Sequence, residues 1–372
     1  MTTTPKVLIL TLLAGHLPAA PVTFLRVPDG GIQPQVVVDA QRTTHLIYFK
    51  GDARQGDIFY LRSADGGATF SAPMRVNSQP GSAIAAGAIR GAQIAAGKGV
   101  HVAWNGAAGG HHGAPMFYTR LNEAGTAFEP QRNLMQRTMA LDGGGSVTAD
   151  TAGNVYVAWH GAAHGAMKGE AERAVWVARS TDAGKTFAPE SPAWAESTGA
   201  CACCGLRGFA DRKGAVYMLY RSAMANVNRD IYLLVSRDAG KSFRGSLLHK
   251  WEINACPMSS MSFAEGAAGV VGAWETQGQI YWTRVDGGAP ALIAAPGDVK
   301  GRRHPFVAVN RGGETLLVWT EGTGWQKGGG FAWQVFDRQG RPTAEKGQAP
   351  GIPVWSFAAT FVRPDDGFTV VY

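Results

Sequence analysis

Seven segments of the chain share one pattern, in which a run of apolar, strand-forming residues ends in an aromatic residue. The aromatic residues are Tyr48, Trp104, Trp159, Tyr220, Trp274, Trp319 and Tyr372. Their spacings are 56, 55, 61, 54, 45 and 53 residues. Each segment contains two short strands around a turn with Gly or Asp, which is typical of a β-hairpin. A repeat of about 50 residues built from short strands predicts an all-β fold, a β-propeller with four-stranded blades.

The composition agrees with this fold class and excludes several others. The 372 residues include 50 glycines, and charged residues make up only 17%. Glycine and proline at this density would interrupt a helical bundle, and no G-X-Y period indicates collagen. The net charge is +7, but Lys and Arg are scattered singly, so no nucleic-acid surface is predicted. No segment has 18 or more consecutive apolar residues, so we expect no membrane span.

The repeats predict seven blades in a single propeller domain, residues 21–372. Six complete blades fit between about Gln33 and Pro350, and residues 356–372 supply two further strands. Residues 21–27 are expected to add a fourth strand to that pair, because they resemble the outer strand of the first full blade at 72–76. A last blade made by both ends of the chain would remove an open sheet edge. A six-bladed propeller with an extra pair of terminal strands is the alternative.

Residues 1–20 are predicted to be a secretory signal peptide. Lys6 precedes an apolar run from Val7 to Leu13, and small residues follow at Ala19 and Ala20. Export would place the chain in the periplasm or outside the cell. In the alternative interpretation, the run from Val7 to Leu13 is a strand of the fold.

A second motif recurs in step with the blades. The segments 63–70, 180–187 and 236–243 share the pattern S-x-D-x-G-x-[ST]-F, with the aspartates at Asp65, Asp182 and Asp238. A weaker copy at 121–128 puts Glu123 at the same phase of the repeat. The aspartate is expected to accept backbone N–H bonds in a tight turn, in which glycine takes a positive φ.

This pattern resembles the Asp box of the sialidase superfamily and its BNR-repeat relatives, and the resemblance covers nearly the whole chain. It implies a sialidase-like propeller. In that family the Asp boxes are structural and lie on the face away from the active site, so the resemblance implies no catalytic role for them. A narrower resemblance, carried by Cys201-Ala-Cys-Cys204 and Cys256-Pro-Met-Ser-Ser260, points to a bacterial sialidase-like subgroup of unsettled function.

Soft metal ligands are concentrated in loops that the blade pattern places on one face of the propeller. The candidates are the sulfur residues Cys201, Cys203, Cys204, Cys256, Met258 and Met261 and the imidazoles of His111, His112, His160 and His164. Thiolates, thioethers and imidazoles together select copper, or alternatively zinc. The sequence therefore predicts a soft-metal site, with copper favoured.

Disulfides are the alternative use of the four cysteines, because an exported chain with an even number of cysteines most simply forms disulfides. One bond between the 201–204 cluster and Cys256 would link two neighbouring blades. The remaining two cysteines would then pair within the cluster.

The sialidase resemblance implies a different set of site residues. That family holds a carboxylate with three arginines, for which Arg90, Arg207 and Arg303 are the candidates here, since each precedes an inner strand. Asp52 is the candidate acid/base, and Glu275 is the candidate carboxylate near the channel. No tyrosine can be assigned as the nucleophile, so the set is incomplete.

Three functions therefore remain open, and the sequence does not decide whether the protein is an enzyme. The first is an exported propeller that binds a soft metal for delivery, storage or redox work. The second is a glycan-binding or glycan-cleaving propeller of the sialidase kind, similar to a glycoside hydrolase. The third is a disulfide-linked scaffold with a protein partner on the propeller face.

Overall fold

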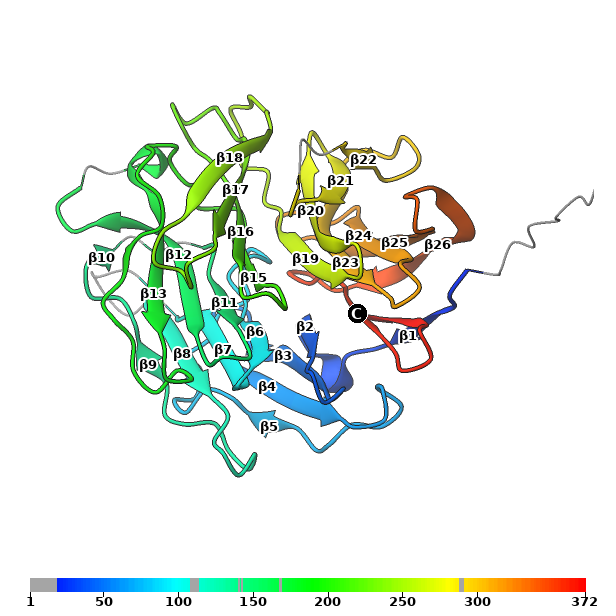
Figure 1. The fold of residues 1–372 in the computed structure, drawn as a ribbon, viewed down its shortest axis with the longest axis horizontal. Helices are drawn as coiled ribbons and strands as arrows, with labels where there is room; N and C mark the ends of the chain where they lie inside the picture. Colours follow the sequence, from blue (N-terminus) through cyan, green and yellow to red (C-terminus); the bar gives the residue numbers. More distant parts are fainter. Residues whose placement is uncertain (1–18, 108–113, 140, 142, 167–168, 288–290) are drawn as a thin grey trace, which may run out of the picture.

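The computed structural model describes residues 19–107, 114–139, 141, 143–166, 169–287 and 291–372. These residues form seven small β-sheets arranged around a central axis, so the protein is a seven-bladed β-propeller (Figure 1). The predicted fold class and blade number are confirmed, and the six-bladed alternative is wrong. In the described part of the chain, no helix is long and apolar enough to cross a membrane. The predicted signal peptide lies almost entirely outside the described residues.

Each of the first six blades follows the chain from its inner to its outer strand. The first contains β2 (Ile32–Val38), β3 (Thr44–Asp52), β4 (Gln55–Ser63) and β5 (Met74–Arg75), and the second contains β6 (Gln93–Gly97), β7 (Gly99–Asn105), β8 (Met116–Arg120) and β9 (Arg132–Asn133). The third contains β10 (Thr138–Met139), β11 (Ser146–Ala149), β12 (Val155–Ala163), β13 (Ala174–Ser180) and β14 (Ser191–Pro192). The fourth contains β15 (Arg207–Ala210), β16 (Val216–Arg221), β17 (Ile231–Ser236) and β18 (Arg244–His249). The fifth contains β19 (Met261–Gly266), β20 (Gly269–Thr276), β21 (Gln279–Arg284) and β22 (Ile293–Ala294), and the sixth contains β23 (Arg303–Val309), β24 (Thr315–Glu321), β25 (Gly329–Phe336) and β26 (Pro342–Ile352).

The seventh blade is built from both ends of the described chain, as predicted. β27 (Ala359–Val362) pairs antiparallel with β28 (Phe368–Val371), and β1 (Val22–Leu25) pairs parallel with β28. This blade has three strands, so β1 is its third strand and not the fourth strand that we expected. The register couples Val22 to Phe368 and Leu25 to Val371, which closes the ring between the two ends of the sequence.

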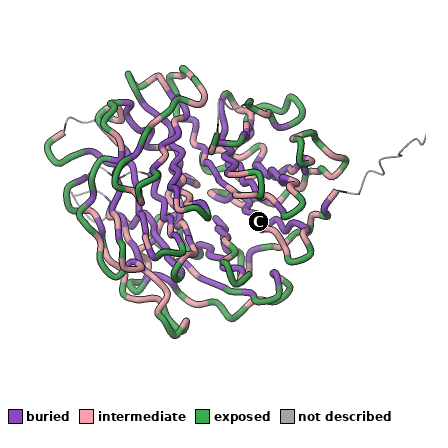
Figure 2. The backbone as a smooth tube through the Cα atoms, in the orientation of Figure 1, coloured by how far each residue is buried: buried purple, intermediate pink, exposed green. Residues whose placement is uncertain are grey.

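The repeat aromatics explain how the blades pack. Six of them lie on the second long strand of their blades and Tyr372 directly follows β28, and Trp104, Trp159 and Trp274 are almost completely buried. The hydrophobic clusters join strands of neighbouring blades, as where Ile47 of the first blade packs with Trp104 of the second. Buried residues accordingly follow the inner strands, whereas exposed residues follow the outer strands and turns (Figure 2). Burial of large aromatics between sheets provides the main favourable free energy of such an interface.

The three Asp boxes are the tight turns that the sequence predicts. In the third blade, Asp182 accepts hydrogen bonds from the Thr186 backbone N–H at 2.9 Å and the Thr186 hydroxyl at 2.6 Å. Asp65 and Asp238 make the same pair of bonds with Thr69 and Ser242. These hydrogen bonds hold the pKa of each aspartate well below its usual range.

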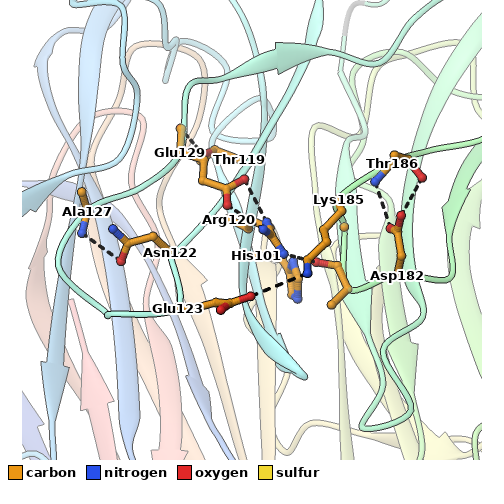
Figure 3. A network of polar contacts seen from close by, with 12 residues as sticks. His101, Thr119, Arg120, Asn122, Glu123, Ala127, Glu129, Asp182, Lys185 and Thr186 are labelled. Carbon is orange, nitrogen blue, oxygen red and sulfur yellow. Dashed lines mark hydrogen bonds and ion pairs between the residues drawn. The ribbon is translucent and has the colours of Figure 1, made fainter.

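The weaker copy in the second blade corrects one assignment. Asn122, not Glu123, occupies the aspartate position, because its Oδ1 accepts the N–H of Thr126, four residues later, at 2.9 Å. Glu123 instead lies 3.6 Å from Lys185 of the next blade (Figure 3). The sequence repeat was therefore displaced by one residue at this box, and an amide oxygen serves as well as a carboxylate to accept the turn N–H groups.

Candidate functional site

Three of the four cysteines lie together in the loop that leads into β15. The Sγ atoms of Cys201, Cys203 and Cys204 lie within 4.8 Å of one another, and the first two are 3.3 Å apart. Cys201 and Cys204 are completely buried and Cys203 is half-buried. All four cysteines are free thiols, since a disulfide requires sulfurs about 2.05 Å apart. The predicted disulfide between this loop and Cys256 is not formed in the structure.

Backbone hydrogen bonds fix the shape of this loop. The Cys204 N–H donates to the Cys201 carbonyl at 3.3 Å, which closes a turn that brings the three side chains together. The Cys201 N–H donates to the Arg221 carbonyl at 2.9 Å, and the Gly205 N–H donates to the Ser259 carbonyl at 2.8 Å. The three cysteines are therefore held between the second strand of their own blade and the loop that precedes the next blade.

A buried guanidinium lies next to the thiols. Arg221, at the end of β16, is completely shielded from solvent, with 0% exposure. Its Nη1 donates to the Arg229 carbonyl at 2.7 Å, and its Nη2 donates to the Glu275 carbonyl and lies 3.2 Å from Glu275 Oε2. The Arg221 guanidinium also lies over the Trp251 ring, 5.0 Å from its centroid. Arg221 thus joins the fourth blade to the fifth.

Glu275 and Arg229 extend this ionic network. Glu275 accepts the Gly278 N–H at 2.6 Å, and burial raises its pKa to about 7 although the charge of Arg221 acts in the opposite direction. Arg229 Nη2 lies 2.7 Å from Glu170 Oε2, and the other oxygen of Glu170 accepts the Ala202 N–H at 2.7 Å. The carboxylate of Glu170 therefore ties the cysteine loop to the arginines.

The three thiols have different proton affinities. Burial alone would raise the pKa of Cys204, but hydrogen bonds from Cys201 and Cys203 and the charge of Arg221 lower it well below its usual value. Hydrogen bonds to Cys201 and Cys204, together with burial, raise the pKa of Cys203. A hydrogen bond with Cys203 lowers the pKa of Cys201, but its interaction with Cys204 and burial outweigh this and raise it. Of the three thiols, Cys204 therefore loses its proton most readily.

Among the predicted histidine ligands, His160 has the environment that best suits metal binding. It is completely buried, and neither of its ring nitrogens makes a hydrogen bond of ordinary geometry within the part of the chain that is described. Burial lowers its pKa to about 4, so the ring is neutral at pH 7. Its nitrogens lie outside the compact group of three sulfurs. However, it is close enough to Cys204 for the charge of that thiolate to act on its pKa.

One position of the repeat supplies three of these residues. His160, Arg221 and Glu275 each directly follow the repeat aromatic of the third, fourth and fifth blades. Their strands β12, β16 and β20 are the second strands of neighbouring blades (Figure 1). Sequence reasoning did not include Arg221 among the site residues, although its position directly after Tyr220 was a signal that could have identified it.

The other predicted metal ligands are dispersed. Cys256 is exposed, and His164 is exposed in a turn after β12. Met261 is buried in the hydrophobic cluster that contains Trp274, and Met258 is half-buried. His111 and His112 lie outside the described residues. Within the described chain, the structure therefore groups three cysteines and no other cysteine, histidine, aspartate or glutamate within ligand reach of them.

The residues implied by the sialidase resemblance also have different environments. Arg207 extends across the channel, where its Nη1 donates to the side-chain oxygens of Gln35, at 2.8 Å, and Gln93. Burial lowers the pKa of Arg207 to about 10. Asp52 is exposed and accepts the Arg54 N–H at 2.8 Å, whereas Glu275 is buried beside Arg221.

Arg303 borders a small pocket that the sequence did not predict. Next to it, Trp325 is 57% exposed and packs edge-on against Trp355, with ring centroids 4.6 Å apart. Lys327 and His304 line the same pocket, and Arg90 lies against Gly87 at its edge. Four non-glycine residues that line it have positive φ angles, namely Ala88 (59°), Met258 (53°), His304 (49°) and Trp355 (66°). Such backbone strain concentrates at ligand sites, and no residue type in the sequence signals it here.

The sequence matches no protein-family model and no curated protein. Solved structures are similar in fold. A protein of unknown function from Dyadobacter fermentans has a TM-score of 0.54 and 14% identity, covering 90% of this chain and 99% of that chain. An α-L-arabinanase of Penicillium chrysogenum, complexed with arabinobiose, has a TM-score of 0.51 and 12% identity, covering 87% and 94%. A Trypanosoma rangeli sialidase, in complex with the inhibitor DANA, has a TM-score of 0.54 and 12% identity, covering 82% of this chain and 56% of that one.

At these identities the likeness establishes the fold alone. The sialidase-like propeller that the Asp boxes imply is confirmed as an architecture. Because one propeller fold carries many unrelated activities, the function has to be argued from the residues of this chain.

Proposed function

We propose that this propeller binds a soft transition metal through Cys201, Cys203 and Cys204, and that the metal is copper(I). The observation that carries the proposal is the clustering of three thiols within 4.8 Å of one another beside a buried arginine. A metal bound about 2.3 Å from each of three sulfurs in one plane would hold those sulfurs about 4 Å apart. The Sγ atoms here have separations of 3.3 Å and up to 4.8 Å, close to that value.

The charges near the thiols favour a metal–thiolate centre. Copper(I) with three thiolates carries an excess of negative charge, which is costly to bury without a counter-charge. Arg221 supplies a permanent positive charge there, and its hydrogen bonds to Arg229 and Glu275 fix its position. The guanidinium is therefore expected to stabilise the deprotonated state of the cysteines, in which they bind metals.

Copper(I) suits this donor set better than zinc. Structural zinc sites in proteins almost always have four ligands in a tetrahedron, whereas the compact group here supplies three sulfurs. Soft thiolates select copper(I), which is stable with three sulfur ligands. Storage or delivery of the ion fits a site at which the half-buried Cys203 leaves one sulfur accessible.

Direct titration tests this function. Protein purified without oxygen is expected to bind about one copper(I) per chain in competition with a chromophoric chelator. Loading should protect the half-buried Cys203 from an alkylating reagent, while the exposed Cys256 still reacts. Absence of stoichiometric binding would refute the metal site, and one tightly bound zinc that copper(I) fails to displace would refute the choice of copper.

A second candidate function is recognition of an acidic glycan on the surface around the small pocket at Arg303, beside the exposed Trp325. The specific observation is an exposed tryptophan packed on Trp355 beside Arg303 and Lys327, since aromatic faces and guanidinium groups suit sugar rings and carboxylates. We propose binding and not hydrolysis, because Glu275 is engaged with Arg221 and Asp52 is exposed in the β3–β4 hairpin.

For this second candidate, calorimetry with a sialylated trisaccharide is the measurement. Trp325→Ala is expected to abolish detectable binding, because it removes the exposed ring. Phe24→Ala removes another exposed aromatic, on the seventh blade, and should leave binding unchanged. Equal binding by the wild-type protein and Trp325→Ala would exclude this pocket.

A further inference from the structure

The end of the channel opposite the cysteine loop contains a second pocket. The cysteine loop precedes the inner strand β15, whereas this pocket lies where the inner strands β2, β19, β23 and β27 end in their hairpin turns. Its volume is about 480 Å³, which lies in the range of small-molecule sites. None of the residues discussed for the metal or the glycan lines it.

The wall of this pocket is apolar. Val36, Val307, Val309 and Val362 contribute to it from three different blades, with Ala264 from a fourth. Valine and alanine side chains offer no hydrogen bonds, so the wall fits an apolar body. The pocket therefore favours a ligand with an apolar part that is more stable against this wall than in water.

The rim is formed by arginines from four blades, namely Arg42, Arg212, Arg311 and Arg363. Three of them have carboxylate partners: Arg311 lies 2.7 Å from Asp366, Arg363 lies 3.1 Å from Asp365, and Arg212 lies 3.4 Å from Glu265. A further carboxylate at the rim, Asp39, lies 3.0 Å from the His45 ring nitrogen and accepts the Thr43 N–H at 2.8 Å.

Arg42 is the exception on this rim. Its backbone N–H donates to the Asp39 carbonyl, but its guanidinium makes no hydrogen bond or ion pair with any described residue. One guanidinium at the mouth of an apolar pocket is thus available to an anion.

The backbone of Arg42 provides an independent observation. Its φ angle is +66°, in the left-handed region that favours glycine. The matching hairpin turns of the third, fourth and sixth blades close with the same N–H to carbonyl bond but have Gly153, Gly214 and Gly313 at this position. An arginine here carries a conformational cost that glycine avoids in those three blades, whereas the matching turn of the seventh blade also has a non-glycine residue, Asp366, at φ +66°. Such strain is often retained where a side chain has a function.

We propose that this pocket binds an amphipathic organic anion, with its acidic head on Arg42 and its apolar body against the valine wall. A carboxylate can pair with the guanidinium through two parallel hydrogen bonds. The pocket volume of about 480 Å³ accommodates a short alkyl chain. The inference is independent of the metal site at the other end of the channel.

Calorimetry with octanoate tests the proposal. The wild-type chain is expected to bind octanoate, and Arg42→Gly is expected to weaken binding about 10- to 100-fold, as for loss of a charged hydrogen-bonding partner. The same variant should unfold at an equal or higher temperature, because glycine relieves the left-handed strain. Weakened binding in a protein of undiminished stability is a result that damage to the fold cannot produce.

Two further variants complete the test. Ala239→Gly also relieves a left-handed residue, at φ +55° in an Asp-box turn away from this pocket, and should leave octanoate binding unchanged. Val38→Glu adds a negative charge to the exposed part of the wall and should weaken binding. No binding by the wild type, or equal binding by the wild type and Arg42→Gly, would overturn the proposal.

Discussion

Replacing Arg221 with methionine is expected to destabilise the protein by about 3–5 kcal/mol, the usual cost of removing one partner from a buried ion pair. The substitution leaves the carbonyls of Arg229 and Glu275 without their donor. It also removes the positive charge that favours the ionised forms of the buried Cys204 and Glu275 side chains. Urea unfolding of the two proteins measures the difference. Because Arg221 joins the fourth and fifth blades, the midpoint should move to clearly lower urea.

The pH dependence of this loss identifies its electrostatic origin. Burial raises the pKa of Glu275 to about 7 in the folded protein, above about 4.3 for an unperturbed glutamate, so its ionisation penalises folding as pH rises between these values. Arg221 opposes that shift, and without it the pKa of Glu275 rises further. The difference in stability between the two proteins should therefore be larger at pH 8 than at pH 5.

Two comparison variants make the interpretation specific. Arg341→Met removes an arginine that is 72% exposed and paired with Asp337, and should change stability by no more than about 0.5 kcal/mol. Adding Glu275→Gln to Arg221→Met removes the unpaired acid and should recover part of the loss. A loss equal to that of Arg341→Met would show that the buried network does not stabilise the fold.

The fold could be predicted from sequence because its determinants are local and repeated. The aromatic that ends each second strand and the S-x-D-x-G turn are short patterns, and their common period of about 55 residues identifies the blades. The position of β1 in its sheet was harder to predict from the sequence. Its parallel pairing with β28 joins residues more than 340 positions apart, and the sequence of Val22–Leu25 does not specify which edge it covers.

The candidate site was predicted in part, for a physical reason. The cysteine cluster is visible in the sequence because its three thiols fall within four residues. Met261 was predicted as a ligand from its loop, but it belongs to strand β19, where it faces the core beside Trp274. The partnership of Arg221 with Glu275 depends on how two blades are placed side by side, and residues 54 positions apart carry no local sign of it.

Replacing Cys204 with serine is expected to lower the affinity for copper(I) by at least about 100-fold, since loss of groups that merely orient a ligand costs about 10- to 100-fold. Within the group the pKa of Cys204 is lowered, whereas the pKa values of Cys201 and Cys203 are raised. Binding to the wild-type protein at pH 7 should therefore release about two protons per copper(I), and affinity should rise with pH. Competition with a copper(I) chelator measures the affinity, and calorimetry in buffers of different ionisation enthalpy counts the protons.

Cys256→Ser provides the matched control, because Cys256 is exposed and lies outside the group of three sulfurs. It should keep both the affinity and the proton release of the wild-type protein. Cys204→Ser also replaces the thiol whose pKa Arg221 lowers by a neutral hydroxyl, so its unfolding must be measured in the metal-free state. If Cys204→Ser folds and binds copper(I) as tightly as the wild type while Cys256→Ser does not, the metal site lies in the 254–260 loop and the three-thiol assignment is wrong.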